Sequence, residues 1–408
     1  MPATTCGCKL GAALSLLISG VSSRKKKNID VSEVALTADE NINKKLRKAL
    51  INGDVRLLRC SWLATPTAEK HFRDSHSTHG DAIVMQRMQD LPAEAFFSPA
   101  EAAALLDRGD RSILVLSCRW LTAAHPEPLG TTLAVMRRYL NSEPTAKGCG
   151  LFWDYASLPQ KAHDGTDRTA DEKGTFKRAL TEMANLYASL TGSAILQLKD
   201  VPPRPEEYDG RIVLFATDEH PLASQNLRQF GEVTRLQLVG GITQARATFA
   251  RHEQAELAVA MLRQKGCDVD LMYNTAAYDR DQGVRYSGWC TFEQACATLA
   301  AAHLVAAEQQ AAARGSRLPR RIAVAQASRP KVIDISNGMT RTRAIEEAPG
   351  EMLAALAAAA DSIEHANFTC EGDRPVVQQL LAELERAMER AARAPRHSKP
   401  EVHGHIVV

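Results

Sequence analysis

Polar and charged side chains directly follow two apolar runs of the chain. Ser117 and Arg119 come after the run at 113–116, and Asp154 comes after the run at 150–153. In a parallel α/β sheet, ligands bind beyond the carboxyl ends of the strands, where side chains of these types can hold a polar ligand through hydrogen bonds and charge. The sequence therefore predicts a ligand-binding site that these three side chains help to form.

The two apolar runs belong to an alternation of strands and helices. We expect strands at 113–116, 150–153 and 194–198, with helices at 129–140 and 172–190 between them. Strands that are apolar along their whole length are typical of parallel sheets, because helices cover both faces of such sheets. The order and spacing of these elements predict a parallel α/β fold, with the polar residues gathered at one edge of the sheet.

Several segments resemble the motifs of two related families. Residues 116–120 (Leu-Ser-Cys-Arg-Trp) and 152–154 (Phe-Trp-Asp) are similar to the first two motifs of Toll/interleukin-receptor (TIR) domains. Residues 287–293 (Ser-Gly-Trp-Cys-Thr-Phe-Glu) are similar to the TIR segment Ser-x-Trp-Cys-x-x-Glu, which opens a helix. The stretch 153–160, followed by 183–187, resembles the fungal heterokaryon-incompatibility (HET) domain more closely. The three TIR-like segments occur in the order that the family has.

The resemblance implies a fold, a substrate and a catalytic residue. The fold is a flavodoxin-like (TIR-type) parallel sheet in a discontinuous domain, formed by residues 110–199 and 285–335. Enzymatically active TIR domains hydrolyse the bond between nicotinamide and ribose in NAD, and their catalytic glutamate corresponds to Glu293. A fixed carboxylate can stabilise the oxocarbenium-like ribose that forms as nicotinamide leaves, and it can direct the attacking water.

The resemblance also implies roles for four further residues. Ser117 and Arg119 would contact the ribose and the diphosphate, since an arginine can give a phosphate two hydrogen bonds at once. Asp154 would shape the pocket, and Trp289 would form one wall of it. NAD enters as a substrate, and no cofactor is implied. Two features depart from the family pattern: residues 158–160 replace a Gly-rich loop, and a long insert separates the third strand from Trp289.

Residues 202–278 form that insert and have a pattern of their own. The expected elements, in the order βαββαβ, are strands at 211–215, 231–238, 244–249 and 267–273 and helices at 222–230 and 253–263. This order is that of the ferredoxin-like fold, and the insert resembles an RNA-recognition motif (RRM). RRM domains stack RNA bases on aromatic side chains of their central strands, but Val213, Arg246 and Thr248 occupy those positions here. We therefore expect a protein-interaction or regulatory module, not an RNA-binding one.

Helical regions are expected to flank the α/β domain. We expect a leader at 1–28, a helical region at 29–108, further strand pieces at 321–324 and 332–335, a linker at 337–349, a helical region at 336–393 and a disordered tail at 394–408. The helix that starts near Asp373 has an apolar stripe, which is typical of packing on its own domain or on a partner helix. Whether the leader is a targeting segment stays open.

Composition excludes several classes of protein. The 408 residues carry 50 Lys and Arg against 48 Asp and Glu, so the net charge of +2 gives no chain-wide basis for binding nucleic acid. Nine cysteines without a CxxC pair favour reduced thiols in a soluble, cytoplasmic protein without a metal site. The apolar run at 10–21 is too short to span a membrane.

Two functions remain open at this point. The first is a signalling or self-recognition protein that hydrolyses NAD with Glu293. The alternative is a non-catalytic adaptor, which would use the sheet and the insert to bind protein partners or a second copy of itself. The enzyme hypothesis requires the Glu293 carboxylate to face a cleft that it shares with Arg119 and Ser117.

Overall fold

The computed structural model describes most of the 408-residue chain. The described residues are 31–74, 83–162, 166–216, 226–239, 244–336, 339–342, 358–368 and 372–393. The expectations for the leader and for the C-terminal tail lie outside these residues, as do residues 222–225 of the helix expected at 222–230. The described part of that segment forms only the short 3-10 helix η7 (Leu227–Phe230).

A six-stranded sheet forms the centre of the main body. Its strands follow the order β1-β3-β2-β4-β9-β10. Their bounds are Leu58–Arg59 (β1), Ile113–Cys118 (β2), Gly150–Phe152 (β3), Ser193–Leu198 (β4), Val332–Ser336 (β9) and Met339–Thr342 (β10). The four inner strands are parallel, while β1 and β10 run antiparallel at the two edges. The expected α/β class is confirmed, with a mixed sheet in place of an all-parallel one.

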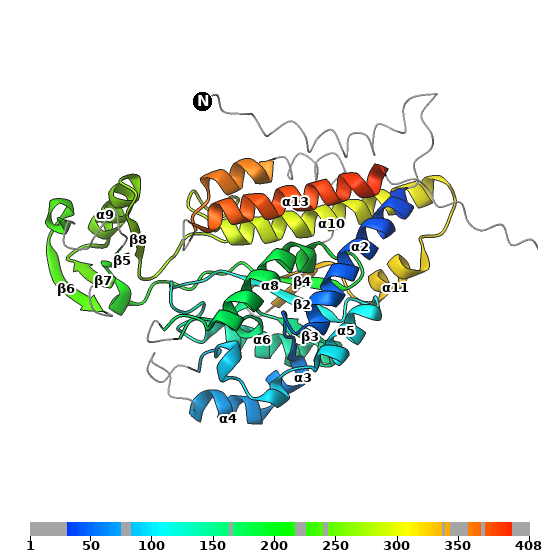
Figure 1. Cartoon of the computed structure of the whole chain (residues 1–408), viewed down its shortest axis with the longest axis horizontal. Coiled ribbons are helices and arrows are strands. Elements are labelled where there is room, and N and C mark those ends of the chain that lie inside the picture. Colours follow the sequence, from blue (N-terminus) through cyan, green and yellow to red (C-terminus); the bar gives the residue numbers. More distant parts are fainter. Residues whose placement is uncertain are drawn as a thin grey trace, which may run out of the picture.

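Helices cover both faces of this sheet. Alternate side chains of β2 enter two separate cores, with Ile113 and Val115 in one and Leu114 and Leu116 in the other. The helices of the first core are α2 (Val31–Ile51), α5 (Pro99–Asp107), α8 (Ala170–Ala188), α10 (Gly288–Ala313) and α13 (Asp373–Arg393). The helices of the second core are α3 (Cys60–Leu63), α4 (Pro66–Asp74), α6 (Thr131–Ser142) and α7 (Asp154–Ser157). Figure 1 shows α10 and α13 side by side, with α3 and α4 at the opposite end of the main body.

The first helix of the described chain is fixed to the sheet by a buried carboxylate. Asp39 of α2 is 2% exposed and accepts hydrogen bonds from the backbone nitrogens of Leu190 (2.6 Å) and Thr191 (3.3 Å). The Thr191 hydroxyl donates a further bond, at 2.5 Å. These contacts lie just before β4 and join the helical N-terminal region to the α/β domain.

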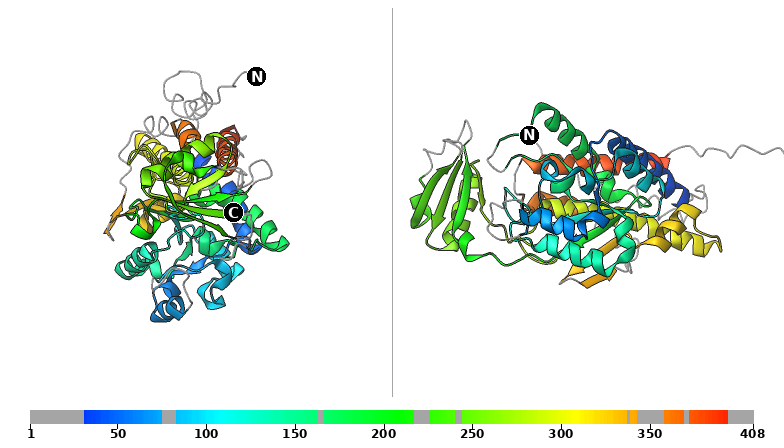
Figure 2. Two further views of the ribbon diagram at one scale, coloured as in Figure 1. Left: turned by 90° about the vertical axis from the view of Figure 1, so that its left-hand side faces the viewer. Right: turned by 90° about the horizontal axis from the view of Figure 1, so that it is seen from below.

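A four-stranded antiparallel sheet forms a separate unit at residues 211–271. Its strands are β5 (Arg211–Phe215), β6 (Val233–Val239), β7 (Gln244–Phe249) and β8 (Asp268–Leu271), in the order β6-β7-β5-β8. Helix α9 (His252–Gln264) packs on one face of it. Figures 1 and 2 show this unit beside the main body, joined to it by two connecting segments. All four expected strands are present.

The remaining elements are short, and two expectations are wrong. The short helices are α11 (Arg320–Ser328), η2 (Met88–Asp90), η3 (Ala93–Ala95), η4 (Pro144–Gly148), η5 (Glu206–Tyr208) and η7 (Leu227–Phe230). The strand expected at 321–324 is therefore part of a helix, because Ile322 and Ala325, three residues apart, are the positions that the fold buries. The linker expected at 337–349 contains a strand, β10, which pairs with β9. The other strand piece, at 332–335, is confirmed.

Candidate functional site

Ser117 and Glu293 meet at the C-terminal end of β2. The Ser117 hydroxyl donates a hydrogen bond of 2.5 Å to Oε2 of Glu293, and Tyr187 of α8 makes a second bond to the same carboxyl group. Glu293 is 6% exposed and lies in the second turn of α10. That helix starts where the sequence motif predicts, because the Ser287 side chain accepts a hydrogen bond from the backbone nitrogen of Cys290 and caps the first turn. The chain thus brings together two of the residues that the TIR resemblance indicates.

Burial makes Glu293 a weak acid. Removal of the carboxyl from water raises its pKa to about 8, although the hydrogen bonds from Ser117 and Tyr187 oppose this change. At pH 7 most molecules with this structure therefore carry a neutral Glu293. A neutral carboxyl can accept and donate hydrogen bonds, but it cannot stabilise a cation as a carboxylate does.

We expect Glu293→Gln to flatten the pH dependence of stability. The unfolded chain loses the Glu293 proton near its ordinary pKa of 4.5, whereas the folded chain keeps it until about pH 8. The contribution of this group to the free energy of unfolding is complete below the unfolded-state pKa. It declines by about 1.4 kcal/mol per pH unit as the pH rises toward the folded-state pKa. Urea unfolding at several pH values between 5 and 8 measures the slope. Equal slopes for wild type and variant would contradict the raised pKa. Glu127→Gln should flatten the slope in the same way, since burial also raises the pKa of Glu127 to about 8.

Arg119 is a buried cation. It is 6% exposed, and its Nε and Nη2 atoms have no hydrogen-bond partner in the part of the chain that the structure describes. Burial lowers its pKa to about 10, and the nearby Cys290 and Asp270 partly oppose this. Burial raises the pKa of the Cys290 thiol, the charge of Glu293 adds to this effect, and Arg119 opposes it. An unpaired buried charge is costly, so an anion that reached Arg119 would be bound strongly.

Asp154 and Trp289 make other contacts. Asp154 opens α7, where its two carboxylate oxygens accept bonds from the Trp120 indole (2.7 Å) and from the backbone nitrogen of Tyr155 (2.7 Å). Burial raises its pKa, and its charge raises the pKa of Glu293, so it lies near the pair without touching it. The Trp289 indole donates to Asp373 of α13 at 2.9 Å. The structure therefore places Trp289 against the C-terminal helix, not beside Ser117.

A segment that the sequence did not mark as functional covers the pair. Residues 272–287, which we call the strap, connect β8 to α10. Within the strap, the fully buried Tyr278 places its hydroxyl in hydrogen-bond contact with the Ser117 hydroxyl. Its neighbour Asp279 forms an ion pair of 2.9 Å with Lys199, which follows β4. Ser117 and Glu293 thus lie buried against the strap, and Arg119 is buried as well. The open cleft that the enzyme hypothesis requires is therefore not present in this arrangement of the described residues.

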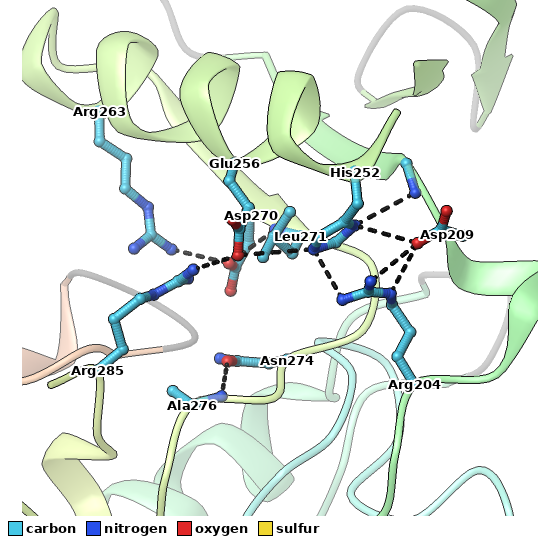
Figure 3. Close-up of polar contacts among 11 residues, drawn as sticks. Arg204, Asp209, His252, Glu256, Arg263, Asp270, Leu271, Asn274, Ala276 and Arg285 are labelled. Atoms are coloured by element: carbon cyan, nitrogen blue, oxygen red, sulfur yellow. Dashed lines mark hydrogen bonds and ion pairs between the residues drawn. The ribbon is translucent and has the colours of Figure 1, made fainter. Parts of the chain in front are cut away.

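The strap is also tied to the four-stranded unit. Arg285 of the strap forms an ion pair of 2.8 Å with Glu256 of α9. On the same helix, Arg263 pairs with the buried Asp270 of β8 at 3.0 Å. Figure 3 shows these groups in one row below α9, with His252 at the far end facing Arg204. A displacement of the four-stranded unit would therefore pull on the strap.

Glu127, an acidic residue between the first TIR-like segment and α6, has a structural role. It is fully buried and accepts hydrogen bonds from the backbone nitrogens of Met85 (2.5 Å) and Leu133 (3.2 Å). It therefore holds the segment between α4 and η2 to the first turn of α6. The described residues contain no group of three His, Cys, Asp or Glu side chains that could hold a metal ion.

Comparisons with known proteins return no match. No protein-family model, curated protein or solved structure matches this chain. In the described residues, no helix has the length and apolar character needed to cross a membrane.

Proposed function

We propose that this chain is a cytoplasmic signalling or self-recognition protein whose TIR/HET-like domain hydrolyses NAD at the nicotinamide–ribose bond. One observation carries the proposal. Ser117 and Glu293, 176 residues apart in the sequence, form a buried pair at the C-terminal end of a central strand, and the unpaired Arg119 lies two residues farther along. This is the combination of carboxyl, hydroxyl and anion-binding group that the reaction needs.

The strand orders support the same proposal. The parallel strands follow the order β3-β2-β4-β9, which is 2-1-3-4 in chain order and agrees with a flavodoxin-like sheet. In such sheets the ligand site lies at the carboxyl ends of the strands, which is where Ser117 and Arg119 are. The order β6-β7-β5-β8 agrees with a ferredoxin-like, RRM-like insert.

The proposed chemistry assigns one task to each group. The bond between nicotinamide and C1′ of the ribose breaks, and its electron pair leaves with nicotinamide. The Glu293 carboxylate stabilises the positive charge that develops on the ribose, and it accepts a proton from the water that adds to C1′. Arg119 binds the diphosphate through its free nitrogens, while Ser117 positions Glu293 and contacts the ribose.

This reaction requires the strap to move for two reasons. The Tyr278 hydroxyl is hydrogen-bonded to the Ser117 hydroxyl and blocks access to it, and the Glu293 carboxyl is neutral while it is buried. Displacement of the strap would admit water and substrate and would lower the pKa of Glu293 toward its ordinary value. We propose that the contacts of the four-stranded unit with the strap set how often this happens.

Tyr278→Phe is expected to raise the rate of nicotinamide release about fivefold. The variant keeps the ring and removes only the hydroxyl, so the closed strap loses one hydrogen bond, worth about 1 kcal/mol. Initial rates at NAD concentrations well below KM measure the change, because saturating NAD would itself hold the strap open. Tyr139→Phe, a buried tyrosine of α6 in the other core, is the matched control and should leave the rate unchanged. A slower Tyr278→Phe enzyme would argue that this hydroxyl serves the reaction instead of blocking the site.

The test of the proposed function is the release of nicotinamide from NAD by the purified full-length chain, separated by chromatography. Release by wild type or by Tyr278→Phe supports the proposal. The absence of release from both proteins would overturn it.

A second candidate, a non-catalytic adaptor, is favoured by the burial of the Ser117–Glu293 pair. In that case the α/β domain and the four-stranded unit would serve as surfaces for protein partners or self-association. Absence of NAD hydrolysis combined with concentration-dependent self-association in sedimentation would support the adaptor.

A further inference from the structure

A cavity of about 430 Å³ lies at the outer edge of the main sheet, beside β1. It is bounded by the C-terminal end of α2, by β1 and by the segment that leads into α5. Its apolar lining residues are Leu50, Val55, Ala93, Phe96, Phe97 and Ala102. A volume of this size, with a mostly apolar wall, is typical of sites for small organic molecules.

Two arginines line the same cavity, each stacked on a phenylalanine. The guanidinium of Arg56 lies 3.6 Å from the ring centre of Phe96, and that of Arg59 lies 4.2 Å from the ring centre of Phe97. Such stacking holds the plane of a guanidinium in place while leaving its N–H groups free to donate.

The charges of the two arginines are satisfied differently. Arg59 forms an ion pair of 2.6 Å with Glu101 and donates to the carbonyl oxygen of Phe96. The Arg56 side chain has no hydrogen bond or ion pair with any described residue, although it is half-buried. Burial lowers the pKa of Arg56, and no carboxylate opposes that effect. The lining also includes Glu94, whose carboxylate forms no ion pair with Arg56. The cavity therefore presents the unengaged N–H groups of Arg56 next to an apolar wall.

We propose that this cavity binds a small carboxylate with a compact apolar body, which Arg56 recognises through its free N–H groups. The planar fork of Arg56 matches the two oxygens of a carboxylate. The apolar lining gains free energy by covering a ring or a short alkyl chain. Arg56 offers one unengaged fork of N–H donors, and one fork fits a monoanion. A phosphate dianion would need further donors, and Arg59 is already engaged by Glu101.

The experiment titrates the full-length chain with three probes and follows binding by calorimetry and by backbone amide shifts. Benzoate has both the charge and the ring, benzyl alcohol has the ring alone, and acetate has the charge alone. We expect benzoate to bind at least tenfold more tightly than the other two, with the largest shifts at residues 93–102. Arg56→Gln should weaken benzoate binding at least tenfold, and Arg56→Lys should weaken it less, because the charge remains while the fork is lost.

The matched control is Arg138→Gln, which removes an exposed arginine of α6 and should leave the affinity unchanged. Thermal unfolding of each variant establishes that it is folded before it is titrated. The proposal is overturned if benzyl alcohol binds as tightly as benzoate, if Arg56→Gln keeps the wild-type affinity, or if benzoate produces no shift at millimolar concentration. Each of these outcomes is independent of whether the chain hydrolyses NAD.

Discussion

Replacement of Glu293 by glutamine is expected to reduce nicotinamide release at least a hundredfold. Glutamine has the shape of glutamic acid and can keep hydrogen bonds with Ser117 and Tyr187, so the fold should survive. It cannot become a carboxylate, and both stabilisation of the ribose cation and acceptance of a proton from water are then lost. Each of these effects alone is worth about a hundredfold or more in other enzymes.

The measurement is the initial rate of nicotinamide release for wild type and Glu293→Gln, each at equal folded concentration. Glu308→Gln is the control, since it makes the same chemical change farther along α10, where the side chain contacts Gln326 of α11. Similar rates for wild type and Glu293→Gln would remove Glu293 from the mechanism, even if hydrolysis itself were observed.

Replacement of Asp39 by alanine is expected to destabilise the fold by about 3–5 kcal/mol, the range found when one partner of a buried charged network is removed. The backbone nitrogens of Leu190 and Thr191 would lose their acceptor. Two buried cations, Arg111 and Lys331, would also lose a carboxylate that favours their charged forms; burial lowers the pKa of both. Urea unfolding at pH 7 measures the change.

Two controls separate this network from ordinary surface effects. Asp39→Asn keeps part of the hydrogen bonding without the charge and should cost less than alanine. Asp107→Ala removes only an exposed ion pair with Arg47 and should change stability by less than about 1 kcal/mol. A loss for Asp39→Ala no larger than that for Asp107→Ala would show that the buried network contributes little.

Local sequence patterns predict most of the strands and helices of the fold. The apolar run at 113–116 lies within β2, and the helix expected at 172–190 coincides closely with α8, which Thr169 and Glu172 cap as a reciprocal pair. The segment at 321–324 (Arg-Ile-Ala-Val) is ambiguous, because a short apolar run fits both a strand and a helix. Strand β10 was missed because an edge strand needs little apolar character.

The site was only partly predictable. Ser117, Arg119 and Glu293 carry motif signals, and the structure places them at one end of β2. Tyr278 carries no such signal, because its contact with Ser117 depends on how the strap crosses the sheet. Trp289 was assigned to the pocket, but its partner is Asp373, a residue far away in the sequence. The positions of Tyr278 and Trp289 both depend on contacts between segments that are far apart in the sequence, and no local sequence pattern encodes such contacts.

The interruption of the main sheet by the four-stranded unit has a consequence for synthesis of the protein on the ribosome. Strand β4 emerges early, but its neighbour β9 emerges only after the whole four-stranded unit and α10. The unit pairs only with itself and can fold as soon as it leaves the exit tunnel, whereas one edge of β4 stays open until translation is nearly complete. An open strand edge can pair with another chain, so slower translation would prolong the period in which the nascent chain is prone to aggregation.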